Sequence, residues 1–184
     1  MTWIDVLAIL VIVGYGVGGF FSGVVRRLIG FVAMYAAFWA ATLMGLQAGG
    51  ILQQTSNFDT PDARIYGFFG LVVAILVIVE GATQLAHSQI QIPAIALNRS
   101  LGVAAGLITG IILTVVCVYE LGAAANPIGG SQLDPMQQRI RDAYNGSHLI
   151  VPIVKTIQKP IVSIFAPALP VDPQIYFGPG PVNP

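Results

Sequence analysis

Charged side chains are scarce in this sequence. Its 184 residues include 8 lysines and arginines and 8 aspartates and glutamates, which make up 9% of the chain and leave no net charge. A soluble domain usually carries about 25% charged residues, so this chain has too few to cover a surface that faces water. With no net charge, the sequence also gives no sign of the basic surface that is typical of nucleic-acid binding.

Cysteine and catalytic patterns are just as sparse. Cys117 is the single cysteine, so the chain cannot form an internal disulfide, and no cysteine spacing suggests a metal site. No carboxylate pair and no nucleophile beside a base stands out along the sequence. The residues therefore predict that the protein is not an enzyme and has no metal ligands and no cofactor.

What the sequence has in abundance is long apolar runs, in a chain that is 55% hydrophobic. A helix needs about 20 mostly apolar residues to cross a bilayer. The first run follows no basic segment and is too long for a signal peptide, so we expect an uncleaved spanning helix there. The sequence predicts an all-α, integral membrane four-helix bundle over residues 1–122, with spans at Trp3–Gly23, Leu28–Leu46, Ile65–Leu85 and Leu101–Leu121.

The connections between these runs differ in length. Val24–Arg27 is short enough for a tight helical hairpin between the first two spans. Gln47–Arg64 reads as a polar loop, with Pro61 near the first turn of the third helix. His87–Ser100 joins the last two spans, and Pro93 should interrupt any continuous helix there.

Basic residues in these connections predict an orientation. Short loops rich in lysine and arginine favour the cytoplasmic side of a membrane. Arg26, Arg27 and Arg99 fall on one side, against Arg64 on the other. We therefore expect a bacterial inner-membrane protein whose first and third connections are cytoplasmic and whose two termini lie outside.

The last third of the chain is more polar. Residues 123–166 should hold a linker, a short helix and a surface helix, followed by a tail over residues 167–184. Asp134 and Pro135 suit the start of the short helix, and Asn145 with Gly146 suits its end.

Ser147–Ala166 predicts an amphipathic, proline-kinked helix in the membrane interface. Its polar side carries His148, Lys155 and Lys159. A fifth span is disfavoured, because each lysine would cost about 2.5–3.5 kcal/mol near the bilayer centre. The prolines of residues 167–184 predict an extended tail that is free to contact partners.

Small residues recur at every fourth position in three of the runs. This spacing keeps them on one helical face, where two backbones can approach closely. We predict helix–helix contacts, within the chain or with a partner, at Gly14, Gly18, Gly19, Gly23, Ala33, Ala37, Ala41, Gly45, Gly102, Gly106 and Gly110.

Glu80 is the one acidic residue well inside a predicted span. Intramembrane acids are rare and often functional, so Glu80 can be proposed to carry protons or bind a cation. The alternative, which the absence of a polar relay favours, is a hydrogen bond or an ion pair with Arg26, Arg27 or Arg99. Asp5 and Glu120 lie near span ends, and we expect them at the outer interface.

Several segments resemble the colicin V production protein (CvpA) family of bacterial inner-membrane proteins. They are Trp3-Ile4-Asp5, Gly19–Leu28 with its basic turn, Leu97–Gly102 leading to Gly106 and Gly110, and Ser147-His148-Leu149 with Pro152. The family usually has aspartate where this chain has Asn98. The resemblance implies a four-helix inner-membrane protein linked to colicin V production or export and to envelope homeostasis, with no defined catalytic mechanism.

Two functions follow from these expectations. The first is a protein that acts through helix packing and association with other membrane-protein subunits or with itself, for instance as an accessory structural subunit of a respiratory or photosynthetic membrane complex. The alternative is a small transporter or channel component that uses Glu80.

Overall fold

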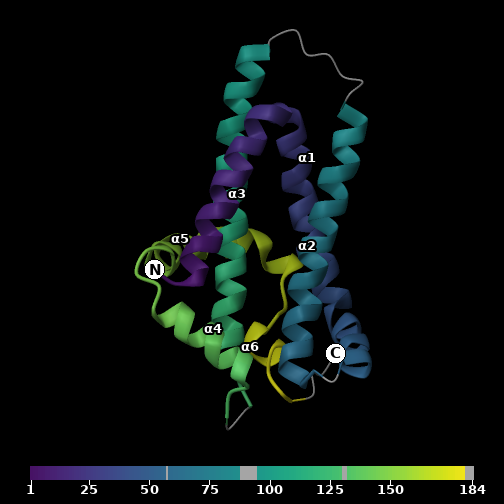
Figure 1. Cartoon of the computed structure of the whole chain (residues 1–184), viewed down its shortest axis with the longest axis vertical. Helices are drawn as coiled ribbons and strands as arrows, with labels where there is room; N and C mark the ends of the chain where they lie inside the picture. Colours follow the sequence, from purple (N-terminus) through teal and green to yellow (C-terminus); the bar gives the residue numbers. More distant parts are fainter. Residues whose placement is uncertain (57, 88–94, 130–131, 181–184) are drawn as a thin grey trace.

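The computed structural model describes residues 1–56, 58–87, 95–129 and 132–180, and the regular elements within these ranges are all helical. The predicted all-α class is therefore confirmed. The elements are α1 (Trp3–Ser56), α2 (Thr60–His87), α3 (Ile95–Ala125), α4 (Pro135–Asn145), α5 (Ile150–Phe165), the 3₁₀ turn η1 (Ala166–Ala168) and α6 (Pro173–Tyr176) (Figure 1).

Gly23 divides α1 into two helices that form a hairpin. Its backbone has φ 74° and ψ 174°, a conformation that residues with a side chain rarely adopt. The chain reverses there, so residues 3–22 and residues 24–56 run in opposite directions (Figure 1). The predicted hairpin exists, but it turns at Gly23 and not within Val24–Arg27, which are helical.

The other two connections are shorter than predicted. Most of the expected polar loop Gln47–Arg64 is helical, because α1 continues to Ser56 and α2 begins at Thr60. The start of α3 at Ile95 likewise lies before the expected Leu101, and Pro93 is outside the described residues. Hydropathy detects the part of a helix that can cross hydrocarbon, and these helices continue beyond that part at their polar ends.

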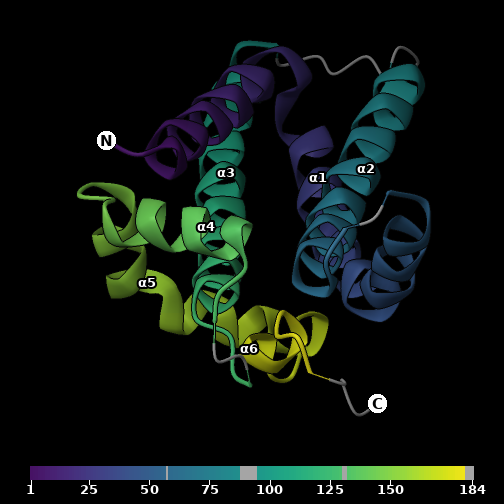
Figure 2. The same ribbon diagram turned by 60° about the horizontal axis from the view of Figure 1, so that its bottom comes forward.

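The spanning helices form two packed pairs. The N-terminal half of α1 packs along α3, which we call the first pair, and the C-terminal half of α1 packs along α2, the second pair. In contrast, α2 and α3 make little contact with each other among the described residues. Figure 2 shows the two pairs diverging from the turn in α1.

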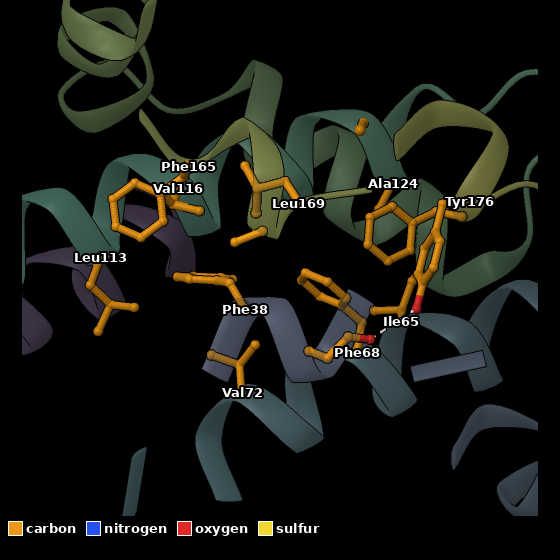
Figure 3. Packing of buried hydrophobic residues seen from close by; sticks show 14 of the residues in the cluster. Phe38, Ile65, Phe68, Val72, Leu113, Val116, Ala124, Phe165, Leu169 and Tyr176 are labelled. Carbon is orange, nitrogen blue, oxygen red and sulfur yellow. Dashed lines mark hydrogen bonds between the residues drawn. The ribbon is translucent and has the colours of Figure 1, made fainter. Parts of the chain in front are cut away.

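The C-terminal segment, residues 165–178, packs between the two pairs. Phe165, Leu169 and Tyr176 pack against Phe38 of α1 and Phe68 of α2 (Figure 3). The expected extended tail is therefore wrong for this segment, which contains η1 and α6. Proline is tolerated in the first turn of a helix, where its missing N–H is not needed, and Pro167 and Pro173 occupy such positions.

Hydrogen bonds hold this C-terminal segment in place. Arg64 donates to the carbonyl oxygens of Tyr176 (3.3 Å), Gly178 and Gly180 (2.8 Å). The Tyr176 hydroxyl donates to the Ala41 carbonyl over 3.2 Å. Burial is the main cause that raises the pKa of Tyr176, so the phenol stays protonated and remains a donor.

The predicted short helix and surface helix are both present. Asp134 accepts a hydrogen bond from the backbone of α4 and forms a capping box with Gln137, while Pro135 takes the first helical position. α5 is long and apolar enough to cross a membrane by length and composition. However, it lies across the long axis of the bundle, as the end-on view of its coil in Figure 1 shows.

The outward faces of α1, α2 and α3 are apolar. Leu10, Val32, Val77 and Ile108 are among the large hydrophobic side chains more than half exposed there. A surface of this kind over helices of spanning length is stable in lipid and would aggregate in water. The chain is therefore an integral membrane protein.

Candidate functional site

The most polar site within the membrane helices surrounds Glu80, near the Gly23 turn. We call this end of the bundle the arginine end. Glu80 Oε1 lies 2.8 Å from Arg27 Nη1, and Glu80 Oε2 lies 3.2 Å from Arg26 Nη2. Arg26 also donates to the Glu80 backbone carbonyl over 2.7 Å. The arginine side chains are nearly buried, at 7% and 13% exposure, so this carboxylate offsets two charges that water barely reaches.

Arg27 is further positioned by the N-terminal half of α1. Its Nε donates to Ser22 Oγ over 3.1 Å, and that hydroxyl donates to the Gly18 carbonyl over 2.6 Å. The guanidinium also lies over the Tyr15 ring, 5.1 Å from its centroid. A Cβ at position 18 would meet Arg27 Nη2 at 2.3 Å, so Gly18 leaves room for this guanidinium, which comes from the C-terminal half of α1.

Asn98 joins α3 to the Gly23 turn. Its Oδ1 accepts a hydrogen bond from the Val24 N–H over 3.0 Å, which satisfies a backbone donor just after the break in α1. Its amide packs where a Cβ of residue 23 would be. Arg99, in contrast, is exposed and lies over the Phe20 ring at 5.4 Å. The three predicted basic residues therefore divide into two that bind Glu80 and one that faces outward.

The glycines of α3 contact the N-terminal half of α1. A Cβ at Gly102 would lie 2.3 Å from the Gly19 carbonyl oxygen, and one at Gly106 would lie 2.2 Å from that of Tyr15. At Gly110 a Cβ would meet the Ile12 backbone at 3.0 Å. These glycines thus permit close packing inside the first pair, and this contact leaves them unavailable to a partner helix.

The second pair uses a similar contact. Ala33, Ala37 and Ala41 are buried, and a Cβ at Gly45 would meet the Tyr176 hydroxyl at 2.4 Å and the Phe68 backbone at 3.3 Å. Gly14 differs, because nothing lies within 4 Å of the position of its Cβ. Gly14 therefore makes no close helix contact with the described parts of this chain, and its contact with a partner stays a prediction.

Asp5 links the start of α1 to α5. It is fully buried, and its Oδ1 accepts hydrogen bonds from the Ser147 hydroxyl and from the Ile150 N–H at 3.1 Å. Ser147 Oγ in turn accepts from the Val151 N–H at 3.1 Å. Asp5 thus caps α5 from a distant part of the chain, and its expected exposure at the interface is wrong. No short-range motif in the sequence reveals this long-range cap.

Glu120 is likewise buried, so the expectation that it faces the interface is wrong. Its side chain is fully buried, and neither carboxylate oxygen has a hydrogen-bond partner within the described parts of the chain. The expectation failed because Glu120 lies on the side of α3 that the C-terminal segment covers, near Tyr176.

The polar face of α5 is open to solvent. His148, Lys155 and Lys159 are all exposed, and Lys155 Nζ lies over the Tyr144 ring at 5.1 Å. Burial raises the pKa of Tyr144. Within the described ranges, no three metal-ligating side chains converge on one point.

The chain is a multi-pass integral membrane protein of the all-α class. Its two helix pairs meet at a glycine turn, where Glu80 forms ion pairs with two nearly buried arginines. Residues 4–144 match the family model described as colicin V production protein. This match covers well over half of the chain, which therefore belongs to the colicin V production protein family. No curated protein and no solved structure matches the chain significantly. The family match ends with α4, so α5 and the C-terminal segment lie beyond it.

Proposed function

We propose that this protein is a non-enzymatic accessory component of the bacterial inner membrane, which acts in toxin production or envelope maintenance by binding other membrane proteins. A larger respiratory or photosynthetic complex is one assembly that such a subunit would serve. Family membership supports the link to colicin V production. The observation that carries the association is a lipid-facing row of small residues on α2.

Gly70, Ala74 and Gly81 make up this row. All three are exposed, and no atom of the described residues lies within 4 Å of the Cβ position at either glycine. Spacings of four and eleven residues bring them onto one face of a helix with 3.6 residues per turn. Because the glycines of α3 are already used inside the chain, this face of α2 is where a partner helix would approach most closely.

The charge distribution supports a cytoplasmic arginine end. Arg26, Arg27 and Arg99 all lie near that end. Arg64, the basic residue that opposed them in the sequence, is bound by three carbonyl oxygens of the C-terminal segment. By the positive-inside rule, both termini and α5 would then lie outside the cytoplasm.

Purification in mild detergent tests the association. We expect the full chain to co-elute with at least one membrane protein, and Gly70→Leu with Gly81→Leu to abolish that co-elution. Gly14→Leu is the matched control, since Gly14 is also an exposed glycine with nothing near it, but lies on α1. A monomeric wild-type protein, or equal loss of partner in the control, would contradict the proposal.

A further inference from the structure

Part of the space between the two pairs remains open beside the C-terminal segment. It is an apolar cleft with a volume of about 340 Å³. The N-terminal half of α1, α2 and α3 form its walls, and Met136 and Ile140 of α4 close one end. No charged residue lines it within the part of the chain that the structure describes, and its walls include Leu7, Val11, Phe69, Val73, Leu76 and Leu113.

One hydroxyl in this cleft lacks a hydrogen bond. Thr114 lines the cleft and is only 6% exposed, yet its Oγ1 has no partner among the described residues. Every other threonine makes a side-chain hydrogen bond, including Thr109 on the same helix, which donates to the Ala105 carbonyl over 2.8 Å. A buried polar group without a partner is uncommon and calls for an explanation, such as a bound molecule.

The depth of Thr114 in the bundle narrows the choice of molecule. Gly106 packs on Tyr15 and Gly110 on Ile12, and this antiparallel register places Thr114 level with Ala8. Ala8 lies five residues inside Trp3, which is about 8 Å along a helix. Trp3 lines the same cleft and is half exposed, as an interfacial tryptophan would be. Thr114 thus lies just below the boundary between headgroups and hydrocarbon.

We propose that the cleft binds one acyl chain of a glycerolipid, with the ester carbonyl oxygen accepting a hydrogen bond from Thr114. The apolar walls take the chain, while the uncharged lining leaves the headgroup outside at the interface. Two turns of a partner helix would occupy on the order of 850 Å³, far more than the cleft offers. A quinone ring would bring a second carbonyl that this single buried hydroxyl cannot satisfy.

Photolabelling of the full chain in vesicles tests the proposal. The probe is a phosphatidylglycerol with a diazirine in the middle of one acyl chain, in vesicles of phosphatidylethanolamine and phosphatidylglycerol. We expect adducts to concentrate on the cleft-lining residues of α2 and α3. Leu76→Trp should obstruct the cleft and remove most of them, whereas Val32→Trp, at an outward position that is 67% exposed, should not.

Thr114→Val keeps the shape of the site and removes only the hydroxyl. We expect it to lower the amount of glycerolipid retained through purification by about fivefold, the effect of one hydrogen bond of ordinary net strength. Adducts spread evenly over all lipid-facing helices, retention unchanged in Thr114→Val, or co-purification of an isoprenoid quinone in place of a glycerolipid would each overturn the proposal.

Discussion

At the scale of single residues, Asp5, Arg27 and Glu120 are the buried charged residues that the structure describes, and other groups compensate all but one of them. Glu80 binds Arg26 and Arg27, and Asp5 accepts the hydrogen bonds that begin α5. Glu120 is the exception, because its carboxylate has no hydrogen bond within the described residues. Unpaired charge is costly in a medium of low polarity, so the compensated sites should contribute strongly to stability.

The Glu80 ion pairs give the first prediction. Glu80→Gln leaves two nearly buried guanidinium groups without a counter-charge, so we expect the free energy of unfolding in mild detergent to fall by about 2 kcal/mol. In a double-mutant cycle, the variant with both Glu80→Gln and Arg27→Gln should lose clearly less unfolding free energy than the two single variants lose together.

The control for this cycle is Arg99→Gln, which changes an exposed arginine that lies over an aromatic ring. Its effect should simply add to that of Glu80→Gln. Strict additivity with Arg27→Gln as well would show that the ion pair contributes nothing. A stable Glu80→Gln variant that loses ion or proton flux in proteoliposomes would instead favour a transporter.

Asp5 gives a second prediction at this scale. Asp5→Ala removes the acceptor for the Ile150 N–H and the Ser147 hydroxyl, which both lie in buried surroundings. We expect a loss of about 2 kcal/mol in unfolding free energy. Backbone amide exchange should also become faster at the start of α5. Asp142→Ala, at an exposed position on α4, is the control and should change little.

At the scale of elements, the bundle depends on one glycine with a positive φ. Gly23 is the only residue of the described α1 with a non-helical backbone conformation, and Asn98 packs against it from α3. The turn therefore couples the reversal of α1 to the position of α3. The stability of the hairpin should therefore be sensitive to a methyl group added at position 23.

Gly23→Ala should therefore destabilise the protein. Alanine disfavours φ 74°, and its Cβ would lie 2.3 Å from Asn98 Nδ2. We expect a lower thermal midpoint in detergent by several degrees. Gly14→Ala, in the open helical part of α1, should be neutral or stabilising, since alanine is the better helix former. Equal midpoints for the two variants would contradict the role given to the turn.

The spans could be predicted from the sequence, but not how they pack. Apolar runs and the cap at Asp134 are local signals, and both identified their helices correctly. The Gly23 turn, the cap that Asp5 provides for α5 and the burial of Glu120 depend on residues far apart in the sequence. The predicted helix ends were also wrong near Ser56 and Ile95, because the helices extend beyond the apolar runs into more polar sequence.

At the scale of the whole molecule, two helix pairs diverge from the arginine end and the C-terminal segment fills part of the space between them. Phe177 is fully buried there and Tyr176 is 5% exposed, whereas Val171 in the same segment is fully exposed. The sequence suggested a free tail available to partners. The packing instead makes this segment part of the bundle, so partners must use other surfaces.

Labelling of single cysteines in intact cells, in a Cys117→Ala background, tests this architecture most directly. A membrane-impermeant maleimide should react rapidly with Val171→Cys, because that residue is exposed and the proposed orientation places the C-terminal segment outside the cytoplasm. Phe177→Cys should stay unreacted until the protein is denatured. Rapid labelling of both would show that the segment is free and not packed between the helix pairs, and would contradict the account.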